Sequence, residues 1–315
     1  MLSLVVGRLV AMVSTLLVSS FVVFAALYVV PGDPVTYLSG GRAQSPEALA
    51  AVRSQYHLDD PLLTRYGRWL GGIARGDLGT SLVYREDVTT LIGPRSLTTV
   101  LLVGYASAII VVFGAGLGVH AALRGGWPGG AISVGTTLLL AVPSFLTAIV
   151  LISVFAVQLG WFPVFGSGSG IADRLYHLTL PAVALALAAV GVVGRIARAA
   201  TGAELQSEHV LTAHARGIPP GQILRRHVLR NAAIPITTVS GLVIASLIAG
   251  SAVIERAFAL DGLGSYLIDA VSARDFPVVQ GICLVLVAVF VCVNTLVDLL
   301  YGVLDPRVAR GAELT

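Results

Sequence analysis

The sequence has little charge and no lysine. Only 12% of its 315 residues are charged, 56% are hydrophobic, and all 20 basic residues are arginine. An ordinary soluble domain carries roughly twice that share of charge, so the composition argues against a soluble protein. The arginines are dispersed and have no aromatic residues grouped beside them, which argues against a nucleic-acid partner.

Residues that carry catalysis or bind metals are also scarce. The two cysteines, Cys283 and Cys292, would be about 13 Å apart along a helix, too far for a disulfide. No cluster of His, Cys, Asp and Glu has the spacing of a metal site, and no nucleophile is paired with a base. The G-x-x-x-x-G-K-[S/T] loop that holds nucleotide phosphates is absent. We therefore expect a chain that is not an enzyme, binds no cofactor or metal, and cannot itself hydrolyse ATP.

Long uncharged runs make up most of the chain. About 20 apolar residues in a helix cross the hydrocarbon core of a membrane, and lipid requires that the backbone groups be satisfied within the segment. The runs do not alternate as the strands of a membrane barrel do. We predict an all-α polytopic membrane protein with six transmembrane helices. The expected spans lie within Leu9–Gly32, Ser96–Leu123, Ala131–Leu159, Leu175–Gly194, Asn231–Ile254 and Phe276–Val297.

The placement of arginine predicts the orientation of these spans, because short cytoplasmic segments are enriched in basic residues. With the N-terminus inside, ten arginines fall in short inside segments and three, Arg174, Arg256 and Arg274, in short outside loops. We therefore expect both termini in the cytoplasm. Residues 1–30 hold an apolar run too long for a typical signal peptide, and we interpret them as an uncleaved signal-anchor helix.

A hydrophilic segment, residues 31–95, follows the first span and is expected outside. It contains seven arginines and seven acidic residues. Within it Leu62, Tyr66, Trp69 and Leu70 have helical spacing. We predict a small folded external cap with one or two amphipathic helices. A core of five helices would follow over residues 96–304, with a cytoplasmic tail over 305–315.

The longest inside segment, residues 195–232, has the pattern of two helices joined at a glycine. Glu204–Arg216 is expected to be helical, Gly217 to end that helix, and Pro219 and Pro220 to start the next one. The second helix carries basic residues beside an apolar stripe. Such a helix can rest on anionic lipid or insert into a groove on a soluble partner, and the pattern alone leaves both open.

Five blocks of sequence, in order along the chain, add a resemblance to this pattern. They are Pro31–Pro34; Tyr56–Pro61 with Tyr66–Leu70 and Arg75–Gly79; Thr212–Ile218 with Leu224–Pro235; Gly262–Gly264 with Ala273–Pro277 and Gln280–Gly281; and Val297–Tyr301 with Asp305–Arg307. These blocks resemble the ABC-transporter permeases of the dipeptide, oligopeptide and nickel import family. The long segment after the first span resembles the B-type permease of each pair.

Two positions depart from the general permease signature. That signature begins Glu-Ala-Ala six residues before the glycine, where this chain has Leu211, Thr212 and Ala213. It also places a proline 13 residues after the glycine, where this chain has Arg230, and the proline here comes at Pro235. The peptide branch shares both departures, so the role of the loop is expected to hold, although no residue here takes the role of the glutamate.

The resemblance implies the type I ABC importer fold and a permease subunit of an ATP-driven importer of dipeptides or oligopeptides in the bacterial cell membrane. Its implied partners are a second, C-type permease, two ATP-binding subunits or one fused ATPase, an external substrate-binding protein or lipoprotein, and membrane lipid. Those ATPases would use ATP and Mg²⁺. Nickel complexes, glutathione and haem are alternative substrates within the same class, and a secondary transporter is a distant alternative, since it would need ion or proton sites within the spans.

The resemblance assigns the contact with the ATPase to the segment around Gly217. The expected coupling residues are Thr212, Ala213, Arg216, Gly217, Ile218, Arg225, Arg226 and His227. An ordinary helix cap is the less favoured alternative for Gly217, and a solvated or lipid-facing surface is an equal alternative for the three basic residues. In the last span, Asn294 and Asp298 are four residues apart and share a face. An interfacial cap or a bond to a neighbouring helix is favoured for them over a transport site.

Overall fold

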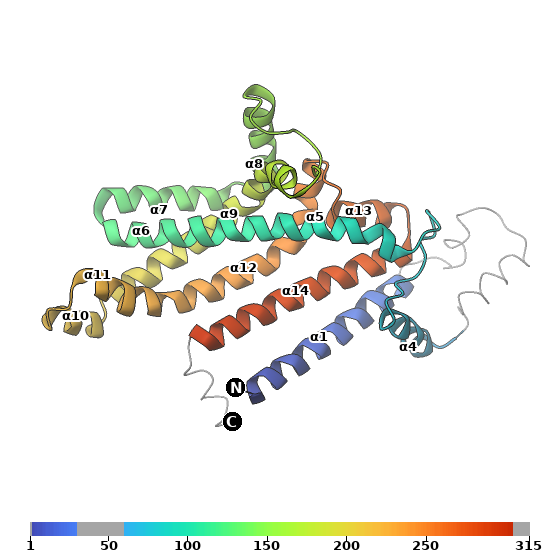
Figure 1. Cartoon of the computed structure of the whole chain (residues 1–315), viewed down its shortest axis with the longest axis horizontal. Coiled ribbons are helices and arrows are strands. Elements are labelled where there is room, and N and C mark those ends of the chain that lie inside the picture. The colour runs from blue at the N-terminus through green and yellow to red at the C-terminus, as the bar shows by residue number, and fades with distance from the viewer. Residues whose placement is uncertain (1, 30–59, 305–315) are drawn as a thin grey trace, which may run out of the picture.

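The computed structural model describes residues 2–29 and 60–304, and its described part consists of helices joined by turns, with one isolated β-bridge between Thr80 and Asp87 (Figure 1). The α-helices are α1 (Leu2–Val29), α4 (Leu62–Ile73), α5 (Val88–Ile109), α6 (Gly116–Arg124), α7 (Gly126–Ala141), α8 (Ser144–Leu151), α9 (Ile171–Leu205), α10 (Glu208–Ala215), α11 (Pro220–Ile223), α12 (Leu229–Ala257), α13 (Leu263–Ser272) and α14 (Phe276–Leu304). Three π-helical segments continue them: η1 (Ile110–Ala115), η2 (Ile152–Gln158) and η3 (Leu224–Val228).

Five helical units are long and apolar enough to cross a membrane. They are Leu9–Ala26, Val88–Arg124, Ile171–Leu205, Pro220–Ala257 and Phe276–Leu296. A sixth unit is a pair, Gly126–Ala141 and Ser144–Gln158, which bends by 102°. The chain is therefore an all-α polytopic membrane protein, as the sequence predicts.

The bent pair corrects one expectation, because a straight span over Ala131–Leu159 was predicted. Val142 leaves the helical region, with ψ at 120°, and Pro143 follows it in an extended conformation. Proline has no N–H to continue the helix, and its ring disfavours the helical conformation in the preceding residue. The break therefore follows from the Val142–Pro143 dipeptide.

Helix α9 lies at the centre of the bundle. It packs against α5, η1, α6, α7, α8 and α12, while α14 packs on α12 and α1 lies along α14 at the edge (Figure 1). In the apolar window of α9, 67% of the residues are buried, compared with 11% in that of α1. α9 is thus the helix on which the other spans are assembled.

The helices around α9 approach closely because small residues lie at the crossings. A Cβ atom on Gly118 of α6 would lie 2.3 Å from the Gly194 carbonyl oxygen and 2.6 Å from Cβ of Ala197, both on α9. A Cβ atom on Gly191 would lie 2.5 Å from the carbonyl oxygen of Thr136 on α7. Small residues at such crossings let helix backbones pack closely where lipid offers no hydrophobic driving force.

The segment after α1 is described from residue 60 onward, and most of the predicted cap, residues 31–59, lies outside the described residues. Helix α4 forms where the apolar spacing predicted a helix. It packs on α1, where the Tyr66 hydroxyl lies 2.8 Å from Ser20 Oγ and its ring meets the edge of Phe21. Helix α5 begins at Val88, earlier than the predicted core boundary at residue 96.

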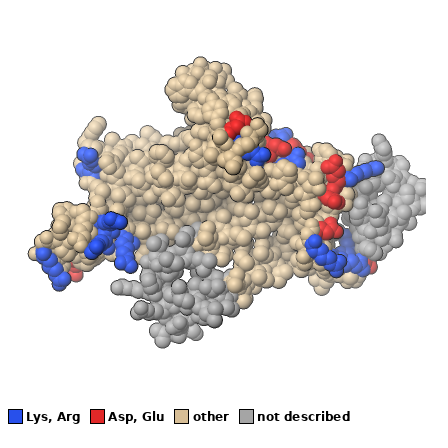
Figure 2. All heavy atoms as spheres, viewed as in Figure 1, with Lys and Arg blue, Asp and Glu red and all other residues tan. Residues whose placement is uncertain are grey.

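The bundle has two polar ends. We call the region of α10, α11 and η3 the α10 end, and the region of α13 with residues 74–87 the α13 end. On the face drawn in Figure 2, charged side chains gather at these two ends and around the start of α9, with uncharged surface between them. The uncharged surface matches the hydrocarbon of a bilayer, which strongly disfavours charge.

The close crossing at Gly118 predicts a large effect from a small substitution. Replacing Gly118 with Ala should destabilise the bundle by about 1–3 kcal/mol, because the added methyl group meets backbone atoms that cannot move independently. Gly116→Ala is the matched control, since its Cβ would meet no atom within 4 Å. Thermal unfolding in detergent measures the difference. Equal apparent Tm values for the two variants would contradict the role of Gly118.

Candidate functional site

The connection from α9 to α12 forms a compact loop at the α10 end. The predicted helix over Glu204–Arg216 is interrupted, because α9 ends at Leu205 and α10 starts at Glu208. Between them Ser207 is extended, with ψ at 149°, and its hydroxyl donates to the Glu204 carbonyl at 2.6 Å. Serine bonds in this way to nearby backbone groups and so competes with helix continuation.

Gly217 ends α10, as the sequence predicts. It has φ of +72°, a left-handed conformation that glycine adopts without steric cost. The Gly217 N–H donates to His214 O at 2.9 Å and the Ile218 N–H to Ala213 O at 3.2 Å. These are the two bonds of a Schellman motif. A Cβ atom here would meet nothing within 4 Å in this chain, so the backbone conformation is what requires glycine.

The loop has a hydrophobic core of its own. Val210, Ala213, Ile223 and Val228 are buried, and Leu205, Ile218 and Leu224 pack against them. Ala213 is only 4% exposed and packs inside the loop, so its side chain presents little surface of its own, and its coupling role stays a prediction. The apolar stripe expected in the second helix supplies much of this core, which makes the loop a small folded unit rather than slack chain.

Most of the other predicted coupling residues are on the surface of this unit. Thr212, Arg216 and Gly217 are exposed, as are Arg225 and Arg226, whereas Ile218 and His227 are half-buried. Arg216, Arg225 and Arg226 form no ion pair with another side chain in the described part of the chain.

The basic residues of the second helix lie on a wider turn than expected. Leu224–Val228 is π-helical and separates the short α11 from α12. A regular helix, which the sequence predicted, would place Arg226 and Arg230 on one face. The π-turn, with its i→i+5 hydrogen bonds, changes that register.

A polar contact that the sequence did not predict connects this loop to α9 and α12, the helices before and after it. Glu204 at the end of α9 lies 3.3 Å from His209 Nε2 of α10 and accepts a 3.3 Å bond from Asn231 Nδ2 of α12. The three side chains are scattered over 28 positions, and only the folded loop brings them together. The loop is therefore fastened to α9 and to α12.

The polar residues predicted within the last span do not form a site in the described part of the structure. Asn294 Nδ2 donates to the carbonyl oxygen of Phe290 at 3.0 Å, within its own helix, rather than to a neighbouring helix. The side chain of Asp298 lies outside the described residues. No group of three or more metal-binding side chains occurs among the described residues.

At the α13 end, Glu255 in the last turn of α12 is a polar residue that the sequence did not single out. This side chain is completely buried. Its Oε1 accepts a 2.7 Å bond from Thr99 Oγ1 of α5, and its Oε2 a 2.9 Å bond from the backbone N–H of Ser265 in α13. The sequence offered one signal for it: Glu255 lies shortly before Gly262–Gly264, one of the blocks that carry the family resemblance.

A second buried acid, Asp275, holds the turn before α5. Its carboxylate accepts bonds from the Ser81 hydroxyl and from the Leu82 N–H at 3.1 Å. Nearby, Arg95 pairs with Asp261 at 2.8 Å and lies 4.1 Å from the centre of the Tyr266 ring. Burial raises the pKa of the Tyr266 phenol, so the phenol is neutral at physiological pH and the contact with Arg95 is a cation–π interaction.

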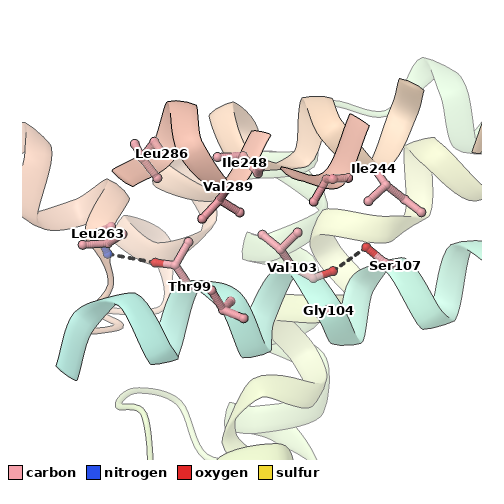
Figure 3. A pocket seen from close by; sticks show the side chains of 11 residues that line it. Thr99, Val103, Gly104, Ser107, Ile244, Ile248, Leu263, Leu286 and Val289 are labelled. Atoms are coloured by element: carbon pink, nitrogen blue, oxygen red, sulfur yellow. Dashed lines mark hydrogen bonds between the residues drawn. The ribbon is translucent and has the colours of Figure 1, made fainter. Parts of the chain in front are cut away.

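An apolar cavity of about 170 Å³ lies between α5, α12 and α14 (Figure 3). Its lining residues are Thr99, Val100, Val103, Gly104, Ser107, Ile244, Ile248, Leu263, Leu286, Val289 and Val293. Both hydroxyls in this lining are already bonded, Thr99 to Glu255 and Ser107 to Val103 O. The cavity wall therefore offers a surface without free polar side chains.

Comparison with protein families gives two matches that together cover most of the chain. Residues 98–310 match the family described as the binding-protein-dependent transport system inner membrane component. Residues 1–102 match the N-terminal region described for a membrane component of the same kind of transport system.

Two relatives match over nearly their whole length. A glutathione transport system permease protein of Pectobacterium atrosepticum is 36% identical over 312 residues, covering 98% of this chain and 99% of the relative. A protein of Brucella abortus named for a peptide transport system permease is 37% identical over the same coverage. Among solved structures, the MetNI methionine ABC transporter in inward-facing conformations matches with a TM-score of 0.55 at 16% identity, over 69% of this chain and 97% of the matched chain. This last likeness concerns the fold alone.

The buried core of the loop predicts that its order depends on Ile223. Replacing Ile223 with Ala should cost about 2–5 kcal/mol and should loosen Glu208–Val228 while the spans stay folded. Hydrogen exchange of the loop amides measures this. Leu211→Ala is the control, because Leu211 is 59% exposed in the same loop. Unchanged exchange in the Ile223 variant would show that the loop core contributes no order.

Proposed function

We propose that this chain, which belongs to the family of binding-protein-dependent transport system inner membrane components, is the permease subunit of an ATP-driven ABC importer of peptides. In this role it forms half of a translocation pathway with a homologous C-type permease. The folded loop at the α10 end carries the proposal, because it is an exposed basic surface connected to α9 and α12, which pack against each other in the bundle.

The loop is suited to pass a movement of a soluble cytoplasmic partner on to the membrane spans. Its hydrophobic core makes it a unit, and Glu204, His209 and Asn231 connect it to α9 and α12. A short amphipathic element of this kind fits a groove on a soluble partner. We assign that partner as an ATP-binding subunit, which would hydrolyse ATP with Mg²⁺. The permease itself would be non-catalytic.

The distribution of arginine supports placing the α10 end in the cytoplasm. Residues 206–230 carry Arg216, Arg225, Arg226 and Arg230 and a single acid, Glu208. Short basic segments of this kind are retained on the cytoplasmic side. Both termini then lie inside and the α13 end outside, where a substrate-binding protein or lipoprotein would dock.

Peptides are the substrate class that the relatives' names support best, and glutathione, itself a tripeptide, falls within it. The experiment is uptake into proteoliposomes that contain this chain, its partner permease, the ATPase subunits and the binding protein. Dipeptides, tripeptides, longer peptides, glutathione, haem and a nickel complex are compared. We expect ATP-dependent uptake of at least one peptide class. Uptake driven by an ion gradient without ATP would identify a secondary transporter and overturn the proposal.

The coupling role of Gly217 is tested with three variants. Gly217→Val should retain assembly and ATP hydrolysis but lose most uptake, because valine strongly disfavours the left-handed backbone. Gly217→Asn separates two causes: asparagine tolerates this backbone, so retained uptake would assign the need to conformation alone, and lost uptake to close approach by the ATPase. Gly202→Val, in α9 and with nothing within 4 Å of its Cβ, is the control. Normal uptake by Gly217→Val would remove Gly217 from the mechanism.

A further inference from the structure

The carboxylate of Glu255 connects three helices at the α13 end. It belongs to α12, and it accepts hydrogen bonds from Thr99 of α5 and from the backbone of Ser265 in α13. Thr99 Oγ1 in turn accepts a 2.8 Å bond from the Leu263 N–H at the start of α13. The hydroxyl of Thr99 is thus both donor and acceptor, and one continuous chain of bonds runs from α13 through α5 to α12.

The turn between α12 and α13 is folded around this carboxylate. The Ser265 hydroxyl donates to Leu260 O at 2.8 Å, and the Leu260 N–H donates to the Glu255 backbone carbonyl at 2.8 Å. A Cβ atom on Gly262 would lie 2.4 Å from the carboxylate. The absence of a side chain at Gly262 therefore leaves the space that the carboxylate occupies.

The burial of Glu255 makes each of its hydrogen bonds costly to lose. Glu255 is 0% exposed and forms no ion pair with any described side chain. A buried carboxyl group is tolerated when its oxygens are hydrogen-bonded, and losing one partner while it stays buried is costly. Separation of α13 from α5 is therefore favourable only if water reaches the carboxylate.

The same residues form one end of the apolar cavity. Thr99 and Leu263, which are bonded to each other, lie together at one end of the lining in Figure 3, whereas Ser107 and Ile244 lie at the other. The hydrogen-bonded chain is therefore part of the cavity wall on the side of the α13 end.

We propose that Glu255 is a positioning residue for transport, whose carboxylate, with Thr99 and the Ser265 N–H, forms a latch that closes the outer end of this cavity. The latch releases when the pathway opens to the outside. The assignment of this end as outer, and of the opening as a transport step, rests on the proposed function above.

The experiment uses the assembled transporter with a cysteine reporter in the cavity. Val103→Cys is suitable, because Val103 lines the cavity, is only 7% exposed, and is close in size to cysteine. Cys283 and Cys292 are replaced with Ala. A membrane-impermeant maleimide is added from the outside without nucleotide, and the rate of labelling is measured by mass shift. Copurification with the ATPase subunits verifies assembly.

Three variants separate the latch from general stability. Thr99→Val keeps the shape but removes the hydroxyl, and we expect about tenfold faster labelling than in the reporter alone, the size expected for losing a hydrogen bond to a carboxylate. Thr99→Ser restores the hydroxyl and should return slow labelling. Gly262→Ala displaces the carboxylate without removing it and should also accelerate labelling. Gly250→Ala, whose Cβ would make only an ordinary 3.6 Å contact, should not.

The outcomes distinguish the latch from the transport proposal. Equal labelling rates in the reporter, Thr99→Val and Gly262→Ala, in transporters that assemble, overturn the latch even if uptake is normal. Fast outside labelling of the unmodified reporter also overturns it. Failure of the parent complex to import any peptide overturns the proposed function instead, and the labelling comparison still decides whether the hydrogen bonds close this end of the cavity.

Discussion

The structure depends on close backbone contact between α9 and its neighbours. Gly118 and Gly191 have no room for a side chain, and the atoms that fill the space are backbone oxygens of the facing helix. Contacts of this kind fix helix spacing more strictly than large apolar side chains, which can repack. These crossings fix α6 and α7 against α9, and α5 and α12 also pack on α9.

One consequence is that packed helices join the two polar ends of the bundle. α12 begins beside the loop at the α10 end and finishes with Glu255 at the α13 end. It packs against α9, and Glu204 at the end of α9 contacts the loop. The contacts of α9 and α12 therefore run without a gap from the loop to the buried carboxylate.

The two ends differ in how they satisfy polar groups. The loop at the α10 end buries apolar side chains and leaves its arginines to solvent or to a partner. The α13 end buries acids, Glu255 and Asp275, and satisfies them with hydroxyl and backbone N–H groups. The first arrangement suits a surface that another protein contacts. The second suits a closed state that persists until water enters, because buried polar groups are stable only when fully bonded.

Local chemistry in the sequence determined the spans, the helix end at Gly217 and the start of α11 at Pro220, since each depends on apolar length or on the backbone preferences of one or two residues. It did not determine the burial of Ala213, the contact of Glu204 with Asn231, or the site of Glu255. Thr99 lies 156 positions from Glu255, so no local pattern could pair them. The break at Ser207 and the π-turn at Leu224–Val228 were also not predicted from the sequence, because tertiary packing selects among backbone conformations of similar energy. Only the assembled bundle decided which polar groups meet, because residues far apart in the sequence come together only when the helices pack.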